Sequence, residues 1–203
     1  MDFSLDGINF FLNKPFATTK FVTEIIENAV VLLEELEKYA GNLPATKGVD
    51  DLKPLLRCLR EEIPVELEIL FARLLKIFLT KSVNRTSLGN PGLSAIVYVL
   101  RRQLRSHNGA TSDICNAVLN SCYDKTNAQL FVDEGGMQIL IRFLGTKDFK
   151  IIISTLGALQ VLCTIPSGRQ LLRQDAEVGS LLHFQVLYAQ GSCYRLYTFI
   201  VLR

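Results

Sequence analysis

The stretch from Phe131 to Gln174 reads FVDEGGMQILIRFLGTKDFKIIISTLGALQVLCTIPSGRQLLRQ, and it decides the fold. Apolar residues such as Ile139, Leu140 and Phe143 recur three and four positions apart, which is the spacing of the buried face of an α-helix. Asp148 stands before the longest apolar pattern, where an acidic residue serves well as a helix N-cap. The stretch therefore predicts successive short helices.

Two landmarks recur along the whole chain of 203 residues. Four helix patterns open on a glycine, and these glycines lie 44, 44 and 43 residues apart: Gly48, Gly92, Gly136 and Gly179. A second pattern precedes each glycine and is built around a small residue, 19, 20, 19 and 21 positions earlier: Ala29, Ala72, Ala117 and Ala158. This regularity predicts a repeat protein with a period near 44 residues.

The residues between the patterns predict where the helices begin. Asn90 and Pro91 suit an N-cap followed by the first helical position, and Asp133 suits a cap in the third copy. No stretch alternates apolar and polar residues over several strands, so the domain is predicted to be all-α. A short helical unit cannot bury its apolar face alone, whereas stacked units share one continuous core.

The sequence resembles the armadillo/HEAT-like repeat superfamily, most clearly over Phe131–Gln174. Gly135 and Gly136 open a helix in this stretch, and Gly157–Leu159 lies in the long helix that follows Asp148. The resemblance implies a right-handed α-solenoid, or superhelix, of about four armadillo-like repeats. The repeat domain would span residues 21–187.

The resemblance also implies a test for peptide binding. In peptide-binding armadillo proteins, an Asn about three residues after the small Ala holds the backbone of an extended peptide. The corresponding positions here are Leu32, Leu75, Asn120 and Val161, and tryptophan is absent from the chain. A receptor for extended basic peptides is therefore disfavoured, and Asn120 is interpreted as a local cap or packing residue.

The two ends depart from the repeat. Residues 1–20 are rich in phenylalanine and are expected to cap the first unit. Residues 188–203 form a divergent apolar tail, for which three interpretations stay open. The tail could close the solenoid as a degenerate helix, it could be an apolar surface for a partner or for self-association, or the chain could be a fragment or splice form of a longer solenoid.

The composition favours a soluble intracellular protein in the cytoplasm, the nucleus or both. Met1–Asn13 lacks the basic start of a secretory signal, and no apolar run approaches the length of a membrane-spanning helix. Five cysteines without a pairing pattern are expected to be reduced and mostly buried.

Charge is distributed unevenly along the chain. Residues 1–70 hold thirteen acidic and seven basic residues, a formal charge of −6, whereas residues 71–203 hold seven and fifteen, a formal charge of +8. The densest basic cluster is Arg101, Arg102 and Arg105. This cluster could dock an acidic protein segment, contact nucleic-acid phosphates, or be a solvated helix face.

No motif points to catalysis. The chain lacks the nucleophile-elbow, phosphate-loop and zinc-protease patterns, and its two histidines, His107 and His183, have no partner residues at metal-ligand spacing. The sequence therefore predicts a non-enzymatic protein without metal or cofactor. The expected function is protein binding, as an adaptor or scaffold, on the concave face formed by successive inner helices.

The candidate partner-binding residues combine that face with the basic cluster: Arg73, Lys76, Arg101, Arg102, Arg105, Asn116, Asn120 and Gln160. The expected partner is a protein, with an acidic segment as one option, and no membrane. The alternative is a nucleic-acid-associated HEAT-like module that uses the basic half of the chain.

Overall fold

The computed structural model describes residues 27–28, 31, 49–61 and 63–174, and this part of the chain contains helices and no strand. The helices are α3 Val49–Arg60, α4 Val65–Phe78, α5 Ser82–Gln103, α6 Ala110–Ser121, α7 Lys125–Asp133, α8 Gly136–Phe143, α9 Phe149–Leu162 and α10 Pro166–Gln174. The all-α prediction is confirmed for these residues. The expected cap 1–20, the tail 188–203 and the landmarks Ala29, Gly48 and Gly179 lie outside them.

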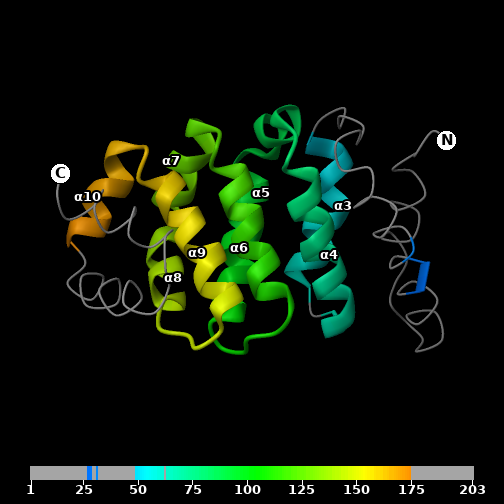
Figure 1. The fold of residues 1–203 in the computed structure, drawn as a ribbon. Coiled ribbons are helices and arrows are strands. Elements are labelled where there is room, and N and C mark those ends of the chain that lie inside the picture. Colours follow the sequence, from blue (N-terminus) through cyan, green and yellow to red (C-terminus); the bar gives the residue numbers. More distant parts are fainter. Residues whose placement is uncertain (1–26, 29–30, 32–48, 62, 175–203) are drawn as a thin grey trace.

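The helices form two layers (Figure 1). In one layer α4, α6 and α9 lie side by side, with α6 packed between the other two. In the other layer α5 packs against α3, α7 and α8. Contacts of α5 with α6 and of α8 with α9 join the layers. We call the first layer the row helices.

One apolar cluster runs from Leu55 to Leu172 between the layers. Phe71, Phe131 and Phe143 are among its largest fully buried side chains. Leu and Phe side chains of this kind each contribute roughly 1.5–3 kcal/mol when they leave water, so a continuous cluster stabilises the whole array rather than one helix. The apolar spacing in the sequence therefore predicts the buried faces correctly.

The chain leaves the row helices by equivalent turns. After α4, Arg85 Nε donates to the carbonyl oxygen of Leu79 at 2.8 Å. After α9, Arg169 Nη1 donates to the carbonyl oxygen of Cys163 at 2.9 Å. Each arginine lies six positions after its acceptor and satisfies a carbonyl at the C-terminal end of a helix.

After two row helices, an asparagine side chain likewise donates to a carbonyl oxygen at the end of the helix. Asn84 Nδ2 donates to the carbonyl oxygen of Phe78 at 2.9 Å, and Asn127 Nδ2 donates to that of Ser121 at 3.3 Å. Both amide groups are again six positions after the acceptor. A buried asparagine suits such a site because its amide group satisfies a carbonyl oxygen that would otherwise need a water molecule.

These turns define equivalent positions in the three row helices. The turn after α6 lies 43 residues after the turn after α4, and the turn after α9 lies 84 residues after it. The equivalent of Ala117 and Ala158 in α4 is therefore Leu74, and the landmark Ala72 is displaced by two residues. Ala117 and Ala158 are both fully buried, which lets neighbouring helices approach closely.

Helix α5 is broken at Gly89, which has φ +56° and ψ −172° inside otherwise helical backbone. A positive φ is strained for residues with a Cβ, so glycine is suited to this break. The helix resumes at Asn90, so the predicted cap at Asn90 is one residue late and Pro91 falls within the restarted first turn.

The sequence predicts N-caps at Asp148 and Asp133, and the structure confirms only the first. Asp148 is the N-cap of α9, and its Oδ1 accepts from the backbone N–H of Lys150 at 2.8 Å, as predicted. The prediction for Asp133 is wrong, because Asp133 is the last residue of α7. Gly135 instead precedes α8, with φ +74°. A left-handed residue turns the chain within one step and leaves no room for a separate capping loop.

Candidate functional site

The row helices present polar side chains that join one helix to the next. Between α4 and α6, Lys76 Nζ lies 2.6 Å from Asp113 Oδ1, and Arg73 Nε lies 3.7 Å from Asp113 Oδ2. The Asp113 side chain is only 14% exposed, whereas that of Arg73 is 41% exposed. The carboxylate therefore fixes Lys76, while much of Arg73 stays accessible to a partner.

Asn116 and Asn120 use their amide groups inside the molecule. Asn120 Nδ2 donates to the carbonyl oxygen of Lys76 at 2.9 Å and so links α6 to α4. Asn116 Nδ2 donates to Ser154 Oγ at 2.9 Å and so links α6 to α9. Both side chains are partly buried. Their contacts support the interpretation of Asn120 as a packing residue.

Helix α9 ends the described row with an exposed apolar face. Phe149 is 54% exposed and Ile153 is 59% exposed, one helical turn apart. Gln160 is also exposed on this helix. Large apolar side chains that are this exposed and adjacent are common at surfaces that meet another element or protein.

The basic cluster does not form one patch. Arg101 is exposed and its Nη2 donates to the carbonyl oxygen of Glu134 at 3.1 Å, toward α7 and α8. Arg105 is exposed beyond the end of α5. Arg102 points to the other side, where it pairs with the buried carboxylate of Glu68.

Arg102 also binds the end of α3. Its Nη1 donates to the carbonyl oxygen of Glu61 at 2.9 Å, and its Nη2 donates to that of Leu59 at 3.2 Å. A guanidinium group suits this position because its planar set of donors can satisfy several acceptors at once. The internal contacts explain Arg102 better than partner binding does.

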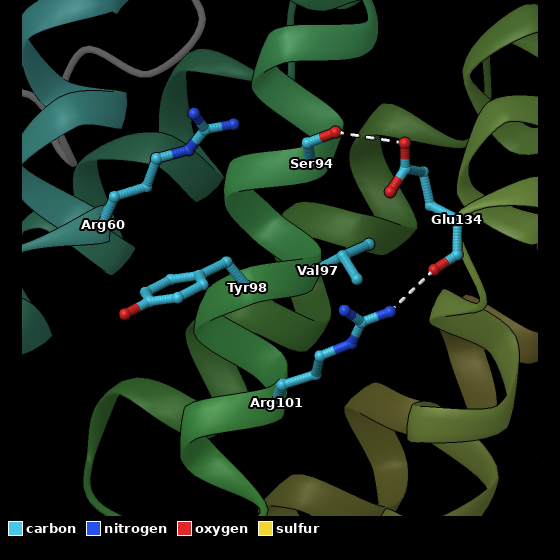
Figure 2. Close-up of a pocket in the computed structure, with 6 residues that line it drawn as sticks. All are labelled: Arg60, Ser94, Val97, Tyr98, Arg101 and Glu134. Atoms are coloured by element: carbon cyan, nitrogen blue, oxygen red, sulfur yellow. Dashed lines mark hydrogen bonds between the residues drawn. The ribbon is translucent and has the colours of Figure 1, made fainter.

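A shallow pocket of about 380 Å³ lies between α3, α5 and the turn before α8 (Figure 2). Its lining comes from α3, α5 and the turn before α8: Arg60, Ser94, Val97, Tyr98, Arg101 and Glu134. Ser94 Oγ donates to Glu134 Oε1 at 3.2 Å, and Arg101 donates to the backbone carbonyl oxygen of Glu134, so α5 bonds both the side chain and the backbone of this turn. Figure 2 shows Tyr98 between Arg60 and Arg101.

Tyr98 makes this pocket similar in composition to a protein–protein interface. Its side chain is 48% exposed, and the Arg102 guanidinium carbon lies 5.9 Å from the centre of its ring. Exposed tyrosine beside arginine is enriched at protein interfaces. Tyr98 is not among the residues predicted from the sequence, although Ser94, Tyr98 and Arg101 lie four and three positions apart on one face of α5.

Positive charge dominates residues 71–174, from the middle of α4 to the end of α10. Residues 71–174 contain thirteen basic and five acidic residues, a formal charge of +8. Several exposed basic residues lie near the turns after α5 and α8: Arg105, Arg142, Lys147 and Lys150. The ring of His107 lies 5.7 Å from that of Phe143, which brings these two turns together.

Four cysteines are buried in the described part: Cys58, Cys115, Cys122 and Cys163. Burial raises the pKa of the Cys115 and Cys122 thiols to about 12. These thiols therefore stay protonated and are poor nucleophiles near neutral pH. This agrees with the prediction that most cysteines pack as small apolar side chains.

Two further features of the described residues bear on metal binding and on membrane spanning. The described part of the chain holds no cluster of three or more His, Cys, Asp or Glu side chains placed for a metal ion. None of the helices described is both long enough and apolar enough to cross a bilayer. His183 and Cys193 lie outside the described residues.

No protein-family model matches the sequence, and no curated protein matches it significantly.

Proposed function

We propose that this protein is a non-enzymatic protein-binding module, an adaptor or scaffold, whose partner binds the face of the row helices. The observation that carries this proposal is the continuous surface of α4, α6 and α9, which lie side by side and are tied together by polar contacts. A surface with side chains already fixed loses little conformational entropy when a partner binds.

The proposed architecture is a short right-handed α-solenoid of about four armadillo-like repeats. The equivalent turns after α4, α6 and α9 support it, since the same connection recurs at spacings of 43 and 41 residues. Solenoids of this kind present one row of helices as an extended binding surface.

The proposed contact residues on this surface are Arg73, Lys76 and Gln160. Arg73 and Gln160 are accessible, and Lys76 keeps 29% of its side chain exposed beside Asp113. Asn116 and Asn120 shape the surface through their internal hydrogen bonds. Arg73 and Lys76 share the single carboxylate of Asp113, so the excess positive charge favours a partner with acidic side chains.

Cross-linked affinity purification with the full chain tests the proposal. We expect the double variant Arg73→Ala and Gln160→Ala to lose specific protein partners. The matched control is Arg105→Ala, which removes an exposed arginine on a different part of the molecule. Circular dichroism checks that both proteins are folded. Equal recovery of the same partners by both proteins would place the binding surface elsewhere.

The second candidate function is nucleic-acid association. The excess of eight positive charges over residues 71–174 favours it. We expect mobility-shift assays with duplex DNA and single-stranded RNA to separate the two functions. Binding that weakens steeply with salt and with Arg105→Glu, Lys147→Glu and Lys150→Glu would favour nucleic acid over a protein partner.

A further inference from the structure

The pocket between α3, α5 and the turn before α8 contains two exposed arginines that form no ion pair with a carboxylate among the described residues. Arg60 Nη2 donates to the carbonyl oxygen of Pro91 at 2.9 Å, and Arg101 Nη2 donates to that of Glu134 at 3.1 Å. A neutral carbonyl oxygen orients a guanidinium group without cancelling its charge, and the group keeps further N–H donors. The pocket therefore offers two oriented cations to a ligand.

Tyr98 supplies an apolar surface in the same pocket (Figure 2). Its side chain is 48% exposed, and the Arg102 guanidinium carbon lies 5.9 Å from the centre of its ring. Arg102 is itself held by the buried carboxylate of Glu68, and Val97, which also lines the pocket, is only 2% exposed. Side chains that are already ordered lose little conformational entropy when a ligand packs against them.

Glu134 limits the kind of anion that fits the pocket. Its carboxylate accepts from Ser94 Oγ at 3.2 Å and stays negative at the edge of the pocket, as Figure 2 shows. Like charges brought together in an interface oppose binding. A nucleic-acid strand carries a negative charge at every phosphate, whereas a protein segment can place one acidic residue among neutral ones. The pocket therefore favours a single carboxylate over a run of negative charges.

The shape of the pocket favours a protein as the source of that carboxylate. The pocket is shallow and would leave much of a small molecule in water, whereas small-molecule sites cover most of the surface of their ligand. Exposed tyrosine and arginine are the residues enriched where proteins bind one another. Planar guanidinium groups also match the geometry of a carboxylate.

We propose that an acidic residue of a partner protein binds in this pocket. Its carboxylate accepts hydrogen bonds from Arg60 and Arg101, and an apolar neighbour in the same segment packs against the ring of Tyr98. The lining comes from α3, α5 and the turn before α8, none of which is a row helix. The pocket is therefore a second binding surface, in addition to the surface of the row helices.

Capture of peptides by the immobilised full chain tests this proposal. The probes are two random peptide libraries that differ only at the central position, which is glutamate in one and glutamine in the other. We expect the protein to retain the glutamate library about tenfold more strongly, because charge-assisted hydrogen bonds form only with the carboxylate. Arg101→Gln should abolish this preference. Glu134→Gln should increase it, because a like charge leaves the pocket.

The matched control is Arg142→Gln, which removes an exposed arginine of α8 that does not line the pocket. Circular dichroism checks that every variant is folded. Equal retention of the two libraries would overturn the proposal. So would a preference that Arg142→Gln and Arg101→Gln lower equally, because the overall positive charge would then explain it. Single-stranded RNA that binds through Arg101 and displaces the peptides would assign the pocket to phosphate groups instead.

The double variant Arg73→Ala and Gln160→Ala separates this pocket from the row helices. It should retain the glutamate library as well as the natural protein does, even where it loses the partners of the row helices. Loss of the glutamate preference in this variant would assign the acidic peptides to the row helices and overturn the proposal for the pocket. The failure of either surface is therefore visible without the other.

Discussion

The side chains of Arg102 and Glu68 join α5 to α4, with Arg102 Nε donating to Glu68 Oε1 at 3.1 Å. The Glu68 side chain is only 6% exposed, and its second oxygen accepts from Asn108 Nδ2 at 2.7 Å. The same guanidinium group binds two carbonyl oxygens at the end of α3. The pair of Arg102 and Glu68 therefore connects three helices and the turn before α6.

Removal of Arg102 should destabilise the fold strongly. Arg102→Ala leaves the Glu68 carboxylate buried with one remaining donor, and we expect a loss of about 3 kcal/mol in the free energy of unfolding. The control is Arg101→Ala, which removes an exposed side chain and should cost less than about 1 kcal/mol. Urea denaturation measures both values. Equal losses would contradict the assignment of Arg102 to the interior.

Asn120 should contribute to stability in the absence of any partner. Asn120→Ala removes the hydrogen bond to the Lys76 carbonyl oxygen, which costs about 1 kcal/mol when the acceptor is partly buried. Thermal or urea unfolding of the isolated protein measures this loss. An Asn120→Ala protein of unchanged stability that lost its partner would point instead to direct contact with a ligand.

Gly168 should tolerate no side chain. A Cβ at this position would lie 2.2 Å from the carbonyl oxygen of Leu162, and backbone cannot move aside cheaply. We expect Gly168→Ala to cost about 3 kcal/mol, whereas Gly145→Ala, with its nearest contact at 3.4 Å, should change stability by less than about 0.5 kcal/mol. Comparable effects of the two variants in urea denaturation would argue against this close approach of α10 to α9.

Buried thiols should make the protein less stable at alkaline pH. The pKa of Cys115 and Cys122 rises to about 12 in the folded protein, from an ordinary value of 9.0. Above about pH 9 the unfolded chain releases thiol protons that the folded chain retains, so the free energy of unfolding falls as pH rises toward 12. Below pH 9 both states keep these protons, and the thiols add no pH dependence.

Urea denaturation between about pH 8 and about pH 10.5 measures this slope. Lysine and tyrosine residues titrate in the same range, so the informative quantity is the difference between the natural protein and Cys115→Ala with Cys122→Ala. The variant should show the shallower decline. Identical slopes would mean that these thiols ionise as easily in the folded state as in the unfolded one.

The sequence predicts the helices well because helix formation follows from local spacing. The apolar spacing around Ile139 and Phe143 identifies buried residues correctly, since a residue three or four positions away lies on the same face. It does not place Tyr98 beside Arg60, because these residues come from different helices. Nor does it separate Arg101 from Arg102, since adjacent residues on a helix point about 100° apart and meet different neighbours.

The two acidic residues before α8 and α9 also show what the sequence pattern does not predict, namely which of the two is an N-cap. Asp133 and Asp148 each precede an apolar pattern, but only Asp148 has the extended backbone of an N-cap, with φ −83° and ψ 110°. At Asp133 the preceding helix α7 continues through the aspartate, and its carboxylate accepts from Gln129 Nε2 at 2.8 Å. Whether the aspartate caps the next helix depends on where the preceding helix α7 ends, and the identity of one residue does not determine that end.

These two aspartates therefore make a matched pair of variants. Asp148→Ala removes the acceptor of the backbone N–H groups of Lys150 and Ile151, so we expect a loss of about 1 kcal/mol in the free energy of unfolding. Asp148→Ser should restore most of that stability, because a serine hydroxyl can accept the same bond. Asp133→Ala should change stability by less than about 0.5 kcal/mol, since an acidic group at a helix C-terminus is opposed by the helix dipole. Urea denaturation of the three variants measures the order. A loss at Asp133 equal to that at Asp148 would contradict the assignment of the cap to Asp148 alone.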